Sequence, residues 1–567
     1  MFNPSGPNMP PPSAPPSIAS GARVVFQPQA LADLCRGADM VVDAIRPTLG
    51  PMARTILVER NAGRHFAPDI LHDSGTIVRR LIALSDPNAD VGAMLLRNAL
   101  WRVHERAGDA VATTAVLFQA IVRQARPYLA AGGNPMQLRE GLLVAAEAVC
   151  EAISAQTEPL DGAQQAMQRW VAAHCADPML TETIANTLAT YGADVSIQVE
   201  NGQSTGIDAE FIRGALWKTG WQASPFTPGE TRQNQMLRLP DAHVLVSDLD
   251  LTSNEHMEPL IMTLTKLKPQ RMLVICRKVS PQILSLFAQA RQKGIGDVVF
   301  AQPPTLSGPD RQAAFMDMAL LTGATFIPHV EEQDGANAMV NLAALLPTCL
   351  GRAEVAWASE HFVGIEGGLG DQARQVAHLA KLDAALEVER NPERIRFYQD
   401  RMALFGGGVV RLKVGAHTDS EQKQRKAQAE RLVRLATQAN RHGVVPGAGL
   451  ALMESEKAAR KSTCKLSSAD ARFGGECLAR ALSAPVAAIA NNAGLDGSAV
   501  VQRNRSCKRG WGIDVLSNRA THLRRAGILD SAYALQLAVR SAASVAATLL
   551  TTDMIVHRRQ SEAALRP

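Results

Sequence analysis

Apolar positions along residues 91–129 repeat at helical spacing on both sides of one break. Before the break they are Leu96, Ala99, Leu100, Val103 and Ala107, and after it they are Thr113, Val116, Leu117, Ala120 and Ile121. Steps of three and four residues are typical of one face of an α-helix. The break, residues 107–114, contains a glycine, an aspartate and hydroxyl side chains. The pattern therefore predicts two helices that meet at a short polar turn.

This turn has the residue types of a phosphate and metal site. The free N–H groups at a helix start attract anions, and a carboxylate such as that of Asp109 can hold Mg²⁺. An ordinary helix start with an acidic cap has the same residue types. On the turn alone, the ordinary helix start is the favoured interpretation.

The pattern changes between about residues 213 and 405, where short strand-like runs alternate with helical segments. The strand-like runs are 243–249, 272–276, 297–300 and 325–328, and the helical segments lie near 255–267, 281–293 and 310–322. This alternation predicts an α/β layer with parallel strands. No glycine-rich loop follows a strand in this region, so we expect a binding domain without its own cofactor.

Composition limits the broad class of the protein. A chain of 567 residues is too long for one core, so two to four domains are expected. The net charge of +5 is too small to indicate a nucleic-acid partner. Basic runs at 423–426 and 503–509 lack the interleaved aromatics of single-strand binding surfaces and are interpreted as solvated surface.

Other features predict the compartment. The eight cysteines are scattered without a C-x-x-C pair, which fits a reducing environment. The Pro- and Ser-rich residues 1–23 have neither a basic start nor an apolar run, so we expect a disordered extension rather than a signal peptide. No apolar stretch is expected to be long enough to span a membrane. A cytoplasmic protein is predicted.

The turn and its surroundings resemble the bacterial group I chaperonins, the GroEL family. That family reads AAGDGTTTATVLAQAI where this chain has its 107–114 turn, and residues 130–142, AAGGNPMQLREGL, are similar to the family's AAGMNPMDLKRGI. The likeness can be followed with few gaps from about Val24 to Val556. It implies a chaperonin-like multidomain α and α/β fold, with a helical equatorial domain, a small intermediate domain and an inserted α/β apical domain.

The resemblance also implies domain boundaries. A disordered extension at 1–23 and a tail at 561–567 flank the equatorial domain (24–155 and 442–560), the intermediate domain (156–212 and 410–441) and the apical domain (213–409).

In the resembling family, both ends of the chain contact ATP and Mg²⁺. Residues 48–51 match the family's TLGP turn, and residues 444–449 are similar to its GVVAGGG loop. The nucleotide contacts so implied are Thr48, Leu49, Gly50, Pro51, Asp109, Thr113, Gly447, Ala448, Asp514 and Asp530, with Asp109 as the metal ligand. His72 stands where the family has a phosphate-contacting lysine.

The hydrolytic residues depart from the family pattern. Asp73 keeps one acidic position, but the family's hydrolytic aspartate is replaced by Arg431, which cannot accept a proton at neutral pH. Glu430 is adjacent, one residue or about 100° around the helix. Val111 and Ala112 replace two threonines, and each lost donor to phosphate costs roughly 1.5–3 kcal/mol of binding. We expect ATP binding with impaired or absent hydrolysis.

The predicted partners follow from the same resemblance. Trp221, Phe226, Ile261 and Leu284 stand where the family has its client-binding surface, although an apolar helical stripe is also typical of a core. We expect non-native client proteins, a lid co-chaperonin and a homo-oligomeric, sevenfold ring, without nucleic acid or membrane partners. The alternative is a structural or regulatory paralogue that forms or caps rings without a nucleotide cycle.

Overall fold

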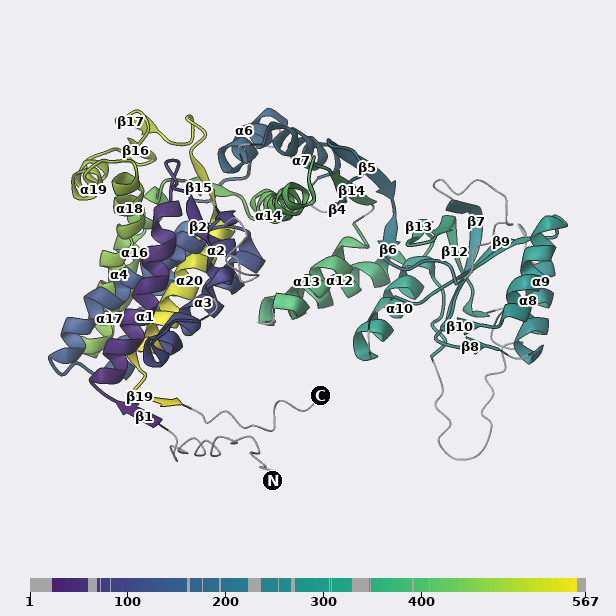
Figure 1. Cartoon of the computed structure of the whole chain (residues 1–567), viewed down its shortest axis with the longest axis horizontal. Helices are drawn as coiled ribbons and strands as arrows, with labels where there is room; N and C mark the ends of the chain where they lie inside the picture. Colours follow the sequence, from purple (N-terminus) through teal and green to yellow (C-terminus); the bar gives the residue numbers. More distant parts are fainter. Residues whose placement is uncertain are drawn as a thin grey trace, which may run out of the picture.

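The computed structural model of this chain describes residues 23–557. It leaves out 60–68, 72, 82, 161–163, 176, 193–194, 223–235, 253, 267–270, 305, 307, 329–345, 347, 390–391 and 407. In Figure 1 a helical bundle lies at one end and a layered sheet at the other, with a smaller set of elements between them.

The helical bundle is built from both ends of the chain and encloses one apolar core. Its long helices are α1 (Gln29–Ile45), α3 (Pro87–Ala107), α4 (Val111–Ala130), α5 (Pro135–Ser154), α17 (Ala469–Ala481) and α20 (Ala532–Leu550). Small residues let these helices approach closely. A Cβ placed on Gly37 of α1 would lie 1.7 Å from the carbonyl oxygen of Ala89 in α3. The α1–α3 crossing therefore requires glycine at position 37.

Helix α20 corrects one expectation. By length and composition it is the one helix among the described residues apolar enough to cross a membrane. The expectation that no stretch meets this criterion was therefore wrong. Its alanines and valines are nevertheless buried in the core of the bundle, against α4 and α5.

Shorter elements complete this part of the fold. They are β1 (Arg23–Phe26), η1 (Arg46–Thr48), β2 (Ile56–Val58), β3 (Asp69–Leu71), α2 (Ser74–Arg80), β15 (Val444–Pro446), α15 (Leu450–Glu454), α16 (Glu456–Thr463), α18 (Ala484–Asn492), α19 (Gly497–Arg505), β16 (Trp511–Asp514), β17 (Arg519–His522), β18 (Leu529–Ser531) and β19 (Met554–His557). The two chain ends meet where β1 pairs antiparallel with β19. A second antiparallel pair, β15 with β18, joins the segments on either side of residues 447–528.

The elements between bundle and sheet have a core of their own. They are α6 (Gln164–His174), α7 (Pro178–Tyr191), β4 (Ser196–Asn201), β5 (Ile207–Arg213), β14 (Gly408–Val414) and α14 (Asp419–His442). Strand β14 lies between β4 and β5, so this small sheet joins chain segments about 200 residues apart. Helix α14 begins at the Thr418 cap, whose side chain accepts a hydrogen bond from Glu421 N–H. It runs from the small sheet to α3 and α20 of the bundle.

The layered end is a six-stranded sheet in the order β11-β9-β7-β12-β13-β6. Its strands are β6 (Ala215–Trp217), β7 (Met236–Val246), β9 (Arg271–Ile275), β11 (Asp297–Ala301), β12 (Gly351–Ser359) and β13 (Val363–Gly368). The short strands β8 (Asp250–Leu251) and β10 (Lys278–Val279) pair beside it. The associated helices are α8 (Asn254–Lys266), α9 (Pro281–Gln292), α10 (Gly308–Thr322), α12 (Gln372–Val388) and α13 (Pro392–Ala403).

The prediction for this sheet was right in one half and wrong in the other. Strands β7, β9 and β11 are parallel and alternate with helices near the expected positions. Strands β12, β13 and β6 pair antiparallel and complete the sheet on the other side. The predicted strand at 325–328 is only an isolated bridge between Ser247 and Ile327.

Candidate functional site

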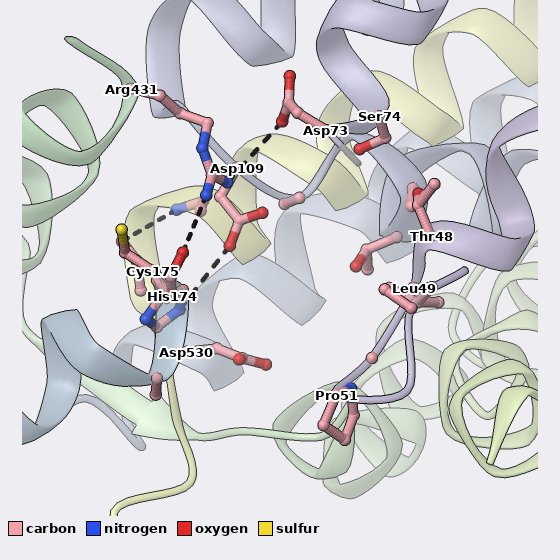
Figure 2. Close-up of a pocket in the computed structure, with 18 of the residues that line it drawn as sticks. Thr48, Leu49, Pro51, Asp73, Ser74, Asp109, His174, Cys175, Arg431 and Asp530 are labelled. Atoms are coloured by element: carbon pink, nitrogen blue, oxygen red, sulfur yellow. Dashed lines mark hydrogen bonds and ion pairs between the residues drawn. The ribbon is translucent and has the colours of Figure 1, made fainter. Parts of the chain in front are cut away.

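A large cavity of about 2520 Å³ lies where α6 and α14 face the bundle. Its lining comes from the η1 loop, the start of α2, the α3–α4 turn, α6, α14 and the segments around β15, β16 and β18. Figure 2 shows carboxylates, an arginine and a histidine from these segments pointing toward one another. Ligand pockets for small molecules typically measure about 300–1,000 Å³, so the cavity has room for a nucleotide.

The turn between α3 and α4 places Asp109 in this cavity. Gly108 ends α3 with φ of 71°, and Ala110 precedes α4 with φ of 64°. Both values are left-handed, a conformation natural to glycine but strained for alanine by roughly 1 kcal/mol. This double reversal directs the chain from one helix into the next. Asp109 stands between the two residues with a side chain that is 42% exposed.

Asp73 reaches the cavity from the start of α2. Its carboxylate caps the helix and accepts hydrogen bonds of 2.8 Å from both the N–H and the hydroxyl of Thr76. Burial opposes its ionisation, but the positive charge of Arg431, the neighbouring His104 imidazole and the Thr76 hydrogen bonds outweigh it. The pKa of the carboxyl is therefore held below its ordinary value. Asp73 is a fixed negative charge at neutral pH.

Arg431 reaches the same carboxylate from α14. Its Nη1 lies 3.8 Å from Asp73 Oδ1, and its Nη2 donates a hydrogen bond of 3.0 Å to the backbone carbonyl of His174. Figure 2 draws both interactions. The approach is possible because position 108 is glycine, since a Cβ there would lie 2.7 Å from the Arg431 carbonyl oxygen. The helix is thus held close against the α3–α4 turn.

His174, at the end of α6, faces the second carboxylate. Its Nε2 lies 3.9 Å from Asp109 Oδ2, and its Nδ1 is 2.9 Å from the carbonyl of Trp170. Burial is the main cause of its pKa being lowered, so the imidazole is neutral at pH 7. The two elements from the middle of the fold, α6 and α14, therefore each contact one carboxylate of the bundle.

Asp530 is the third carboxylate of the cavity, on β18. Burial and the charge of Asp109 raise its pKa to about 7, and a hydrogen bond from the Gly449 backbone partly opposes this. A carboxyl whose pKa is raised by a neighbouring carboxylate is one that a cation would stabilise in its ionised form. The acidic side of the cavity is electrostatically suited to a divalent cation.

The residues fit Mg²⁺ only together with a ligand that brings its own oxygens. No group of three or more His, Cys, Asp or Glu side chains within the described part of the chain is arranged to hold a metal. Mg²⁺ is usually bound by one or two carboxylates plus substrate phosphates and water. Asp109 would supply the protein ligand in such a complex.

The predicted nucleotide contacts converge on this cavity. Nine of the ten predicted nucleotide contacts line the cavity: Thr48, Leu49, Gly50, Pro51, Asp109, Thr113, Ala448, Asp514 and Asp530. The tenth, Gly447, lies just behind it, where a Cβ would be 3.1 Å from Asp530 Oδ1. Asn492 fixes the η1 loop by donating to the carbonyls of Arg46 and Leu49 at 2.9 and 2.8 Å. The structure thus gathers these residues, and their role in binding stays a prediction.

Several cavity residues carry no clear sequence signal. His174 and Cys175 belong to a segment with no nucleotide motif, and only the folding of α6 over the bundle brings them in. His104 lies within the helical pattern but was not singled out. The sequence signal that could have identified it is a histidine on the otherwise apolar face of α3, one turn before the Gly108–Asp109 turn.

The predicted client-binding residues lie away from this cavity. Trp221 is partly buried against the sheet core, and Ile261 and Leu284 are partly buried against the neighbouring cluster under α8 and α9. Met262, beside Ile261, is 52% exposed. Phe226 and His72 lie outside the described residues. A client-binding role for these positions stays a prediction.

Comparison with known proteins agrees with this architecture. The model of the TCP-1/cpn60 chaperonin family matches residues 41–253 and 224–560. The chain belongs to this chaperonin family. The match covers well over half of the sequence and includes every segment that lines the cavity.

Solved chaperonin structures share the fold. One is the chaperonin gp146 from bacteriophage EL 2 (Pseudomonas aeruginosa), crystallised in the presence of ATP-BeFx. Its crystal form I matches with a TM-score of 0.67 and 17% identity, covering 95% of this chain and 99% of that one. Crystal form II matches with a TM-score of 0.61 and 18% identity over the same shares. The predicted chaperonin fold, helical at one end and α/β at the other, is thereby confirmed.

The two left-handed residues of the α3–α4 turn give a matched pair of variants. Ala110→Gly removes backbone strain and should raise the thermal unfolding midpoint, corresponding to a gain of about 1 kcal/mol. Gly108→Ala adds strain and a clash with the Arg431 carbonyl, and it should lower the midpoint by at least a comparable free energy. Scanning calorimetry of both variants checks the pair. If the unfolding midpoints of the two variants shifted in the same direction, the left-handed geometry of the turn would be contradicted.

Proposed function

We propose that this chain is a ring-forming chaperonin subunit of the cytoplasm that binds ATP with Mg²⁺, hydrolyses it poorly and assists non-native proteins. The observation that carries the proposal is the position of Arg431. Its guanidinium occupies the cavity beside Asp73, where hydrolysis calls for a group that orients water.

The charges on the two sides of the cavity support ATP binding. Asp73, Asp109 and Asp530 come from the bundle, and Arg431 approaches from α14. Asp109 would hold Mg²⁺, which neutralises phosphate charge and bridges the phosphate oxygens. Arg431 would donate to the terminal phosphate, because a guanidinium binds phosphate oxygens through paired N–H groups.

The same charges explain why turnover should be slow. An arginine cannot accept a proton at neutral pH, and Val111 and Ala112 offer no hydroxyl to a phosphate oxygen. The Asp73 carboxyl has its pKa lowered by Arg431 among other groups, which makes it a weak proton acceptor. Arg431 therefore favours the bound ground state more than the reaction.

Arg431 also changes the electrostatic interaction that holds α14 against the bundle. A carboxylate at position 431 would face Asp73 and add to a cavity that already holds Asp109 and Asp530, so closure would need a cation to offset repulsion. Arg431 instead makes the contact between α14 and the bundle attractive with the protein's own charges. This observation favours a second candidate function, a structural or regulatory ring component without a nucleotide cycle.

Membership of the chaperonin family is the basis for including client binding in the proposal. The layered end, with Trp221, Ile261 and Leu284, would receive non-native proteins together with Phe226, which lies outside the described residues. A lid co-chaperonin would close over this end. The partly buried positions of three of these residues favour a surface on which clients contact the rim of the apolar clusters.

The first test reverses the charge at position 431. Arg431→Asp should raise the rate of phosphate release from ATP by about tenfold or more, because it restores a carboxylate that can orient water. Adding Val111→Thr and Ala112→Thr should raise the rate further through restored hydroxyl donors. Phosphate release and binding of a fluorescent ATP analogue would be measured side by side.

Lys426→Asp is the matched control, since it makes the same charge change on α14 at a residue that does not line the cavity. The proposal that Arg431 impairs hydrolysis is contradicted if the unaltered protein already hydrolyses ATP at a rate that Arg431→Asp leaves unchanged. In that case Glu430, which also lines the cavity, is the next residue to replace. Nucleotide binding with no release supports the proposal, and the absence of both supports the structural paralogue.

The second test concerns assembly. Rings need two different complementary edges that close by rotation. Light scattering of the purified protein should give a mass near seven times the chain mass of 60.7 kDa, or twice that for a double ring. Negative-stain images should show sevenfold rings. A single species near the mass of one chain would contradict ring formation.

A further inference from the structure

His104 is a buried imidazole that neither the resemblance nor the nucleotide contacts assign. It lies on α3, and its side chain is only 8% exposed although it lines the cavity. Its Nδ1 has no hydrogen-bond partner among the described residues and lies 3.9 Å from Asp73 Oδ2. A buried polar atom without a partner costs free energy unless something compensates for it.

The surroundings of His104 hold the ring in this place. A Cβ on Gly75 would lie 2.0 Å from Nδ1, so the imidazole needs glycine at the first turn of α2. Its other side stacks on Trp101, with ring centroids 5.1 Å apart and planes 25° from parallel. The guanidinium of Arg79 lies over Trp101 at 5.3 Å. These contacts fix the ring beside Asp73.

We propose that His104, paired with Asp73, is the proton acceptor for the slow ATP hydrolysis of this chain. The inference rests on the proposed function, because it concerns the same cavity and the same reaction. It assigns the task that Arg431 cannot perform to a residue of α3 that also lies beside Asp73.

The proton balance of the reaction requires such an acceptor. When a phosphoanhydride is hydrolysed, the water oxygen bonds to the terminal phosphorus and the bridging P–O electron pair leaves with the diphosphate. One water proton must then be taken up. Asp73 would receive it at the carboxylate and pass it to Nδ1 of His104, which gains the proton as an imidazolium.

The charges around His104 suit this transfer. Burial lowers its pKa, Arg434 and Arg431 on α14 act in the same direction, and Asp73 and Glu105 oppose them. The ring is therefore neutral at pH 7 and able to accept a proton. Once protonated, the imidazolium would be stabilised by the adjacent Asp73 carboxylate. A neutral imidazole is a stronger base than a carboxylate whose pKa is lowered.

The lowered pKa of His104 sets the direction in which phosphate release should change with pH. Because the pKa of His104 lies below its ordinary value near 6.5, the acceptor is available at neutral pH and is lost as pH falls through that pKa. Phosphate release by the unaltered protein should therefore decline on the acidic side while nucleotide binding persists.

The experiment combines kinetics with a readout that needs no turnover. Phosphate release would be followed from pH 5 to 8 in the full-length protein, in His104→Gln, and in the control His361→Gln, which replaces an exposed histidine of the β12–β13 turn. His104→Gln should reduce release at least tenfold and remove the acidic limb, with the affinity for a fluorescent ATP analogue unchanged. His361→Gln should change neither property.

Hydrogen exchange at the histidine C2 position, read by mass spectrometry, would report the titration of His104 without nucleotide. Its midpoint should lie below the ordinary histidine value near 6.5 and should rise in Arg431→Gln, which removes a positive charge that lowers the pKa of His104. A midpoint unaffected by Arg431→Gln would overturn the pairing. So would a rate and pH profile of His104→Gln equal to those of the unaltered protein.

The two proposals fail differently. If the protein binds the ATP analogue but releases no phosphate at any pH, the role of His104 is overturned and the proposed function stands. If it does not bind nucleotide, both are overturned.

Discussion

The contact of Arg431 with Asp73 and with the His174 carbonyl connects three parts of the chain that are far apart in sequence. It holds the C-terminal half of α14 against the first turn of α2 and the end of α6. Gly108 makes the approach possible, and the left-handed turn that it begins also carries Asp109 into the cavity. One ion pair and one glycine thus determine both the shape of the cavity and the charges that face it.

These charges have different effects on nucleotide binding and on ATP hydrolysis. In the proposed function, the Arg431 guanidinium would pair with anionic phosphate oxygens and Asp109 would hold the cation. Hydrolysis needs in addition a group that takes a proton from water, and basicity falls when a positive charge stands next to a carboxylate. The replacement of a carboxylate by Arg431 therefore acts on Asp73 as well as at its own position.

Much of the local structure could be predicted from the sequence, because it depends on short-range patterns. The helices on both sides of the 107–114 turn follow from the spacing of their apolar residues. The parallel strands β7, β9 and β11 followed from strand–helix alternation. The antiparallel strands β12 and β13 did not, since besides each other they pair with β7 and β6, which lie more than 100 residues away in the chain.

Only the site residues that stand in recognisable family motifs could be predicted from the sequence. Thr48–Pro51, Asp109 and Asp530 stand in segments that resemble family motifs, and the structure brings them to one cavity. His104 and His174 stand in helices whose pattern indicates packing alone. Their position depends on how α3 meets α2 and how α6 covers the bundle, which no local pattern encodes.

The most direct test of this role of Arg431 is a cryo-electron microscopy structure of the protein incubated with Mg²⁺ and ATP for less time than one turnover takes. We expect an intact triphosphate in the cavity, with Asp109 at the cation and the Arg431 guanidinium moved from Asp73 to the terminal phosphate. A cavity that contains only the diphosphate, with Arg431 still on Asp73 and another carboxylate beside the phosphate, would contradict it.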